Sequence, residues 1–262
     1  MDTIAAPYPI AAVIVLCGVA SALGKFGDDV VREFLGTAML VITTCTPGVW
    51  YARSSARAAW VAHGLGVIGT DVACGGPHCN PSVSLAMWAL GHLDSGRRFA
   101  ARTASQVAGA LAGFRACAVV AEVMALDHLP GPTFDPRMAP AAAQDEALAT
   151  AGLCAAILLL SFELPTTSIY AVKMSVLAAC IRMLILAFPT AGPAMNPAIG
   201  TGWGCAGRAA FGCPGSVEHY ACYWAASWLG ALAAVVLYAA LFGKRVFGRD
   251  VVPLGGQKGK LA

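Results

Sequence analysis

Two short stretches decide the fold: Cys79-Asn80-Pro81-Ser82 and Met195-Asn196-Pro197-Ala198. Asn is a favoured N-cap and Pro is favoured at the first helical position, so each Asn-Pro pair predicts a helix that starts there. Each pair is preceded by a loop rich in Gly and Pro and followed by one or two apolar turns, too few to span a membrane alone. Two such half-helices can meet at the middle of a membrane protein, with both N-termini facing a pore.

The composition is that of a membrane protein. The chain has 262 residues, of which 58% are hydrophobic and 12% are charged. A soluble domain has about 25% charged residues, and its helices carry polar faces that most segments here lack. The net charge of +3 is too small and too dispersed to suggest a nucleic-acid partner. We therefore expect an all-α membrane protein with several spans.

The ten cysteines are scattered, mostly inside apolar segments, and include no Cys-x-x-Cys pair. Buried cysteine behaves as a small hydrophobic residue, and this explains most of them. Cys205 and Cys213 share one polar loop. They either form a disulfide, if that loop is lumenal or extracellular, or remain a free pair.

Apolar stretches between charged or Pro-rich connections predict six membrane spans and two half-helices. The spans cover residues 30–50, 58–73, 99–125, 145–160, 169–188 and 219–242, and the half-helices cover 80–90 and the residues from Asn196 onward. The apolar residues before Lys25 form either an extra N-terminal membrane helix or a cleaved segment. The chain thus divides into an N-terminal segment (1–29), a membrane domain (30–243) and a basic tail (244–262) that the positive-inside bias assigns to the cytosol.

The membrane domain contains an internal repeat, with halves at about 30–125 and 143–243. The first and fourth spans both begin with Glu-x-x-x-Thr, at Glu33 and Glu146. Asn80 follows Glu33 by 47 residues, and Asn196 follows Glu146 by 50. Each half has three spans, so the second copy is inverted relative to the first. Inverted repeats with broken helices at the midplane are a transport architecture.

With these motifs the chain resembles the aquaporin (major intrinsic protein) family over about Val30 to Phe242. Besides the boxes and the Glu-x-x-x-Thr starts, the resemblance rests on Gly75-Gly76-x-His78 before the first box and Ala191-Gly192 before the second. It implies an aquaporin-like channel domain in a lipid membrane, with no catalytic residue, no cofactor and no metal. The resemblance alone implies a homotetramer of independently conducting subunits.

The chain departs from the orthodox family pattern at three positions. The first box ends in Ser82 instead of Ala, Ile199 stands where the filter arginine follows the second box, and Gly200 replaces the acidic residue of glycerol-type members. With the extra apolar N-terminus, these departures resemble the unorthodox superaquaporins. That resemblance favours an intracellular membrane, of the endoplasmic reticulum or a vesicle, over the plasma membrane.

Asn80 and Asn196 are the strongest candidates for pore residues. As an N-cap, each side-chain oxygen accepts from backbone N–H groups of its own half-helix. The amide N–H₂ then points into the pore and donates to a passing water oxygen. Two donors and two positive helix ends orient that water, interrupt a proton wire and repel cations. The alternative is that both boxes, including Pro81 and Pro197, are ordinary loop-to-helix caps.

Glu33 and Glu146 are carboxylates near the start of apolar spans. An ionisable group within a span usually faces the interior and has a partner. The resemblance implies that each carboxylate accepts hydrogen bonds from the backbone of its half-helix loop. The alternative is a solvated acid in a helix first turn, where the helix dipole favours it.

The resemblance also assigns a selectivity filter by counting from the two boxes: Trp60, Leu184, Pro193 and Ile199. This ring is apolar and lacks a fixed cation. His63 competes with Trp60 for the first position if the loop before Asn80 is shorter than typical.

Three charged residues inside the expected spans are further candidates. Arg115 and Glu122 lie seven residues apart on the third span, and we expect them to pair within the bundle. Arg182 is two residues from Leu184, on roughly the other side of that helix, so we do not expect it to replace the missing filter cation.

The sequence therefore favours a passive channel for water or small neutral solutes such as glycerol and peroxide. An intramembrane enzyme is the alternative from another class, but no Ser/His/Asp grouping, His-x₃-His or paired metal-ligand motif is present in the sequence. A pore-dead structural paralogue in an organelle membrane is the third hypothesis.

Overall fold

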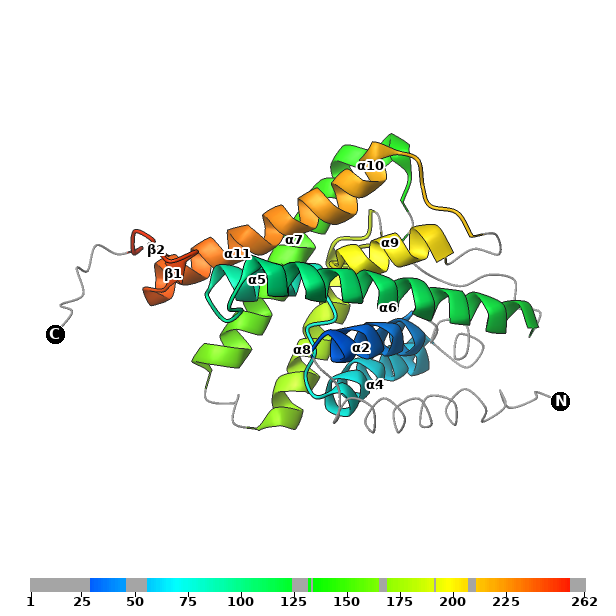
Figure 1. Ribbon diagram of the computed structural model, residues 1–262, viewed down its shortest axis with the longest axis horizontal. Helices are drawn as coiled ribbons and strands as arrows, with labels where there is room; N and C mark the ends of the chain where they lie inside the picture. The colour runs from blue at the N-terminus through cyan, green and yellow to red at the C-terminus, as the bar shows by residue number, and fades with distance from the viewer. Residues whose placement is uncertain are drawn as a thin grey trace.

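The computed structural model describes residues 29–45, 56–123, 132, 134–164, 169–190, 192–206 and 211–254, which are almost entirely helical (Figure 1). The first half contains α2 (Asp29–Thr44), α4 (Ala56–Cys74), α5 (Pro81–Ala89) and α6 (Gly96–Val123). The second half contains α7 (Ala139–Leu158), α8 (Tyr170–Ala187), α9 (Pro197–Ala206), α10 (Val217–Tyr220) and α11 (Ser227–Phe242). The apolar N-terminal segment lies outside the described residues.

Three helical rods in the described part of the chain are long and apolar enough to cross a membrane. They are Pro136–Glu163, Tyr170–Ala187 and Val217–Phe242. The first combines a 3₁₀ turn, α7 and a π-helical turn over Leu159–Glu163. The third joins α10 to α11 through a π-helical turn over Ala221–Ala226. Apolar helices of this length are expected in a multi-pass membrane protein.

The helix expected over 145–160 begins earlier than the sequence suggested. It starts at Ala139. Pro140 lies in its first turn, where a backbone N–H has no intrahelical partner to lose, and the alanines that follow are strong helix formers. The charged residues around position 145 therefore lie inside the helix instead of marking its start.

The two halves use the same close contact at equivalent positions. In the first half α2 packs against α6, and in the second half α7 packs against α11. A Cβ on Gly109 of α6 would lie 2.3 Å from the Phe34 carbonyl oxygen, and one on Gly230 of α11 would lie 2.1 Å from the Ala147 carbonyl oxygen. Phe34 and Ala147 each follow the glutamate of the repeated motif. The internal repeat is therefore also a repeat in space.

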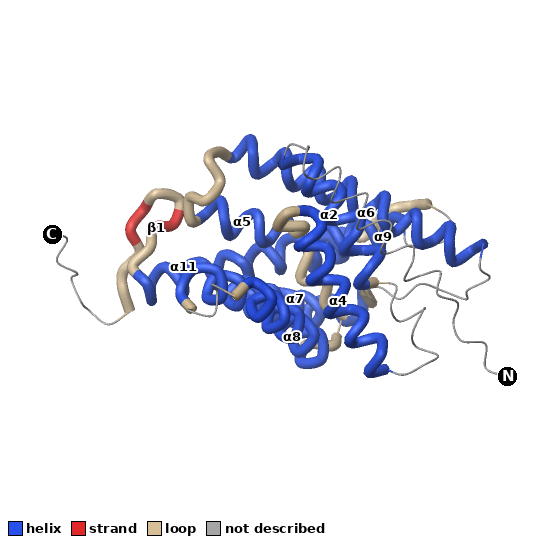
Figure 2. The backbone as a smooth tube through the Cα atoms, turned by 90° about the horizontal axis from the view of Figure 1, so that it is seen from below, coloured by secondary structure: helices blue, strands red, loops and turns tan. Residues whose placement is uncertain are grey.

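The halves also interlock (Figures 1 and 2). The half-helix α9 packs against α6 of the first half, and the half-helix α5 packs against α11 of the second. The full helices α4 and α8 join the halves directly, with Val67 clustered against Met174 and Ala178. This arrangement carries the start of each half-helix to the centre of the molecule.

The described part of the basic tail, up to residue 254, contains a small hairpin that contacts the first half-helix. Strands β1 (Arg245–Val246) and β2 (Arg249–Asp250) pair in antiparallel register. The Phe247 N–H donates to the Ala89 carbonyl oxygen at 2.7 Å, and the Phe247 ring lies edge-on to Trp88, with centroids 5.2 Å apart. The tail thus satisfies one of the carbonyls that a helix C-terminus leaves unpaired.

Of the two states considered for Cys205 and Cys213, the structure contains the disulfide. Cys205 lies on α9, and Cys213 lies in the loop that leads to α10. Disulfides persist in oxidising compartments, so this bond favours a loop on the lumenal or extracellular side.

Candidate functional site

The Asn-Pro boxes build two capped helix starts. Asn80 precedes α5, and its Oδ1 accepts a hydrogen bond from the Ser82 N–H at 2.8 Å. Asn196 precedes α9, and its Oδ1 accepts from the Ala198 N–H at 3.0 Å and the Ile199 N–H at 3.3 Å. Pro81 and Pro197 occupy the first helical positions. The sequence contains no other asparagine than these two.

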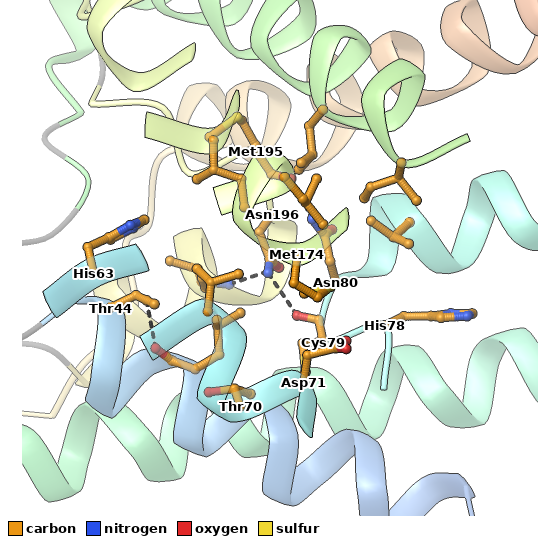
Figure 3. Close-up of a pocket in the computed structure, with 18 of the residues that line it drawn as sticks. Thr44, His63, Thr70, Asp71, His78, Cys79, Asn80, Met174, Met195 and Asn196 are labelled. Atoms are coloured by element: carbon orange, nitrogen blue, oxygen red, sulfur yellow. Dashed lines mark hydrogen bonds between the residues drawn. The ribbon is translucent and has the colours of Figure 1, made fainter. Parts of the chain in front are cut away.

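The two caps are also bonded to each other's loop (Figure 3). The Asn80 Nδ2 donates to the Met195 carbonyl oxygen at 2.7 Å, and the Asn196 Nδ2 donates to the Cys79 carbonyl oxygen at 2.8 Å. Each amide nitrogen carries two N–H bonds, so a second one remains for a molecule in the adjoining cavity. The amides therefore tie the half-helix ends together as well as facing the cavity, a role the sequence did not reveal.

A backbone turn in each loop makes this exchange possible. Cys79 and Met195 have φ angles of 54° and 50°, in the left-handed region that side chains other than Gly disfavour by roughly 1–2 kcal/mol. Both residues directly precede a box asparagine, and their carbonyls receive the two cross-bonds. The left-handed backbone at Cys79 and Met195 therefore accompanies the two hydrogen bonds that join the half-helix starts.

Glu33 fixes the loop before the first box by accepting hydrogen bonds from its backbone. It is 1% exposed, and its carboxylate accepts the N–H groups of His78 at 3.0 Å and Cys79 at 2.8 Å. The Arg102 Nη1 donates to it at 2.9 Å and the Gln106 Nε2 at 2.8 Å. Four charge-assisted hydrogen bonds compensate for removing this carboxylate from water.

Glu146 has the equivalent place in the second half. It is fully buried, and it accepts from the Ala194 N–H at 3.0 Å and from the Ser227 hydroxyl at 2.8 Å. Ser227 precedes Gly230 by three residues, as Gln106 precedes Gly109. Each glutamate thus links its half-helix loop to the last helix of its own repeat.

Both asparagines line a cavity of about 870 Å³ that draws its wall from both halves of the chain. Most of that wall is apolar, and it includes Val67, Val83, Leu153, Met174 and Ile181. Figure 3 shows the asparagines between His63 on one side and Asp71 and His78 on the other.

The helices α4 and α8 run antiparallel along this cavity. At one end the Tyr170 hydroxyl donates to the Asp71 carboxylate, and at the other the Arg182 guanidinium lies over the Trp60 ring, 4.6 Å from its centroid. Trp60 precedes Asp71 by 11 residues, or about 16 Å along α4. The cavity therefore has two distinct ends, each bridged by a pair of side chains.

Three of the four residues assigned to the filter line the cavity, and one does not. Trp60, Pro193 and Ile199 belong to its wall, and so does His63, the competitor of Trp60. Leu184 is absent from the wall. Its side chain occupies the space beside Gly152 of α7, where a Cβ would lie 2.7 Å from the leucine Cδ2.

The α8 residues on this part of the cavity wall are Ile181, Arg182 and Ile185. Arg182 and Leu184 lie on different sides of the helix, as expected, but Arg182 is the one on the cavity wall. Side chains two residues apart point about 200° apart around a helix, so Leu184 and Arg182 cannot both face the cavity. The usable signal in the sequence was the charge itself, because intramembrane cations are functional by default.

This fold and site define a multi-pass, all-α membrane protein whose inverted repeats meet at two half-helix ends beside a cavity. A family model described as the major intrinsic protein matches residues 21–238. The chain therefore belongs to the major intrinsic protein family, whose members are membrane channels for water or small solutes and not enzymes. A search of curated proteins finds no match to the chain.

Proposed function

We propose that this chain is a passive channel for water and small neutral solutes, with glycerol and peroxide as candidate permeants. The observation that carries the proposal is the reciprocal bonding of Asn80 and Asn196 beside the cavity. It brings two helix N-termini together at one point of the path. A pair of ordinary loop caps has no reason to meet in this way.

Ion exclusion follows from the charge at that point. Each half-helix N-terminus carries about half a positive charge, and both are directed toward the cavity. The remaining N–H of each asparagine amide donates to a water or solute oxygen and holds its hydrogens away from the centre. Cations are repelled, and a continuous hydrogen-bonded path for protons is interrupted.

The apolar wall suits neutral solutes with some carbon surface. Trp60, Pro193 and Ile199 are the filter residues that we retain, and none of them carries a formal charge, although Arg182 lies over Trp60 in the same wall. Water that passes along an apolar wall gives up hydrogen bonds, whereas a partly apolar solute gains contact there. We therefore expect modest water permeability together with measurable permeability to glycerol or peroxide.

Glu33 and Glu146 act, in this proposal, as anchors of the two half-helix loops. Each accepts a backbone N–H from the loop before its box, and each is bonded to the last helix of its repeat. They fix the strained turns at Cys79 and Met195 without touching the permeant. The resemblance to superaquaporins, through Ser82 in the first box, supports an intracellular membrane.

We further propose that the channel assembles as a homotetramer, as the family resemblance implies. Exposed apolar side chains cover the outer faces of α4 and α8, among them Val61, Leu65 and Met183. Such surfaces are compatible with contact to lipid or to a neighbouring subunit. The basic tail from residue 244 onward is assigned to the cytosol, across the membrane from the Cys205–Cys213 loop.

Osmotic swelling of vesicles that contain the purified protein tests the proposed function. The channel predicts water permeability above that of protein-free vesicles, and a second swelling phase when glycerol is the external solute. Vesicles that behave like protein-free ones would favour the pore-dead paralogue or an intramembrane enzyme. The mass of the complex in mild detergent tests the tetramer.

A further inference from the structure

We propose that Arg182, which lies over the ring of Trp60 and shares the cavity wall with His63, supplies a cation and hydrogen-bond donors at one end of this pore, in place of residue 199. The inference rests on the proposed function, because it names the selectivity site of that channel. It concerns the end of the cavity remote from Asp71, where Arg182 and His63 line the wall.

The first observation is the position of Arg182. It projects from α8 into the cavity wall and lies over the indole of Trp60 on α4, so the two side chains bridge the helices that flank the path. The face of an aromatic ring attracts a guanidinium placed over it, and this attraction favours one position of the Arg182 side chain. The positive charge is therefore kept in one place beside the path.

The second observation is that these donors are left without protein partners. Within the described part of the chain, Arg182 forms no ion pair with an acidic side chain, and its Nε is buried without a hydrogen-bond partner. The His63 Nδ1 is also buried and has no partner. No acidic side chain in the described ranges therefore neutralises the Arg182 guanidinium, and its charge acts on molecules in the cavity whose wall it lines.

The chemistry of the two side chains specifies that occupant. Guanidinium N–H groups only donate, so they bind oxygen acceptors on water, glycerol or another neutral solute. A fixed positive charge repels cations before they reach the asparagines. Ile199 offers neither charge nor donor, and therefore cannot supply this function from its place on α9.

The positive charge of Arg182 lies at the opposite end of the cavity from the charged side chains of Asp71 and Lys173. Asp71 and Lys173 line the wall near Tyr170, about 16 Å away along α4. The asparagine pair lies between the two ends. A cation that enters the path is thus repelled by Arg182 at one end and by the positive half-helix termini at the centre. The two electrostatic barriers act in series.

The experiment compares wild-type, R182Q, R182K and R137Q proteins in vesicles. Arg137 is the matched control because it is exposed, pairs with Asp135 and lies outside the cavity wall. We expect R182Q to raise potassium leak about tenfold or more and to slow glycerol uptake several-fold. R182K, which keeps a charge at the site, and R137Q should retain cation exclusion within a factor of about three.

Glyoxal treatment of the folded wild-type protein provides a second arm that does not depend on the folding of a variant. Glyoxal reacts with guanidinium groups, so it should modify Arg182 in the peptide mass map and raise potassium leak to the R182Q level. R182K should resist this effect. An unmodified Arg182 in a sample whose Arg137 is fully modified would overturn the proposal.

The two possible failures are distinguishable. Conducting wild-type vesicles whose R182Q counterparts show the same potassium leak and glycerol uptake would overturn the role of Arg182 and leave the proposed function intact. Wild-type vesicles that pass neither water nor glycerol would overturn the proposed function itself, and the selectivity role with it.

Discussion

Replacement of Asn196 by Asp tests the centre of the pore most directly. In the wild type the Asn196 Nδ2 donates to the Cys79 carbonyl oxygen at 2.8 Å, and the residue is 3% exposed. The Asp carboxylate keeps the oxygen that caps α9 but has no N–H. The carboxylate introduced at position 196 and the Cys79 carbonyl oxygen then face each other as two acceptors. The unpaired Cys79 carbonyl lowers the stability of the fold by about 1–3 kcal/mol.

The electrostatic change is larger than the loss of one hydrogen bond. A unit negative charge attracts a cation at about 4 Å by roughly 4 kcal/mol when the effective dielectric constant is about 20. Since about 1.4 kcal/mol corresponds to a factor of ten, the upper limit on enhanced cation entry is about a thousandfold. Water in the cavity screens part of this, so we expect a rise in potassium leak of at least tenfold, together with reduced water permeability.

Stopped-flow swelling and potassium-dependent voltage changes in vesicles measure both effects. Asn196→Ser is the matched control, because it keeps a capping oxygen, loses the amide donor and adds no charge. It should alter water flow without a large cation leak. If Asn196→Asp vesicles match the wild type in both water flow and cation exclusion, the argument that this amide lies on the conduction path is refuted.

Three further predictions concern stability. Gly109→Ala places a methyl group 2.3 Å from a backbone oxygen of α2 and should lower the free energy of unfolding by about 1–3 kcal/mol. Gly69→Ala is the control, because its methyl group meets nothing within 4 Å and should not lower that free energy. Thermal unfolding in detergent compares the two variants. Loss of the Cys205–Cys213 bond, which joins residues 8 apart, should cost about 2–3 kcal/mol, and peptide masses without reductant should show the bond. Phe247→Ala removes the edge-on ring contact with the first half-helix, so protease should cut the tail faster.

Local chemistry explains what the sequence determined by itself. The starts of α5 and α9 follow from the capping and backbone preferences of Asn80, Pro81, Asn196 and Pro197, which act within one turn. The repeat was readable because the same spacing recurs from each Glu-x-x-x-Thr start. Composition identified a membrane protein, since a chain with so few charged residues cannot cover its helices with polar faces.

The tertiary structure decided what depends on the rotation and meeting of separate elements. Counting from a box cannot give the rotation of α8 against α7, which places Leu184 beside Gly152 and Arg182 on the cavity wall. The exchange between Asn80 and Asn196 joins loops 116 residues apart in sequence, so it exists only once both halves have folded. Contacts between distant segments are not encoded in any local pattern, because each depends on where every intervening helix packs.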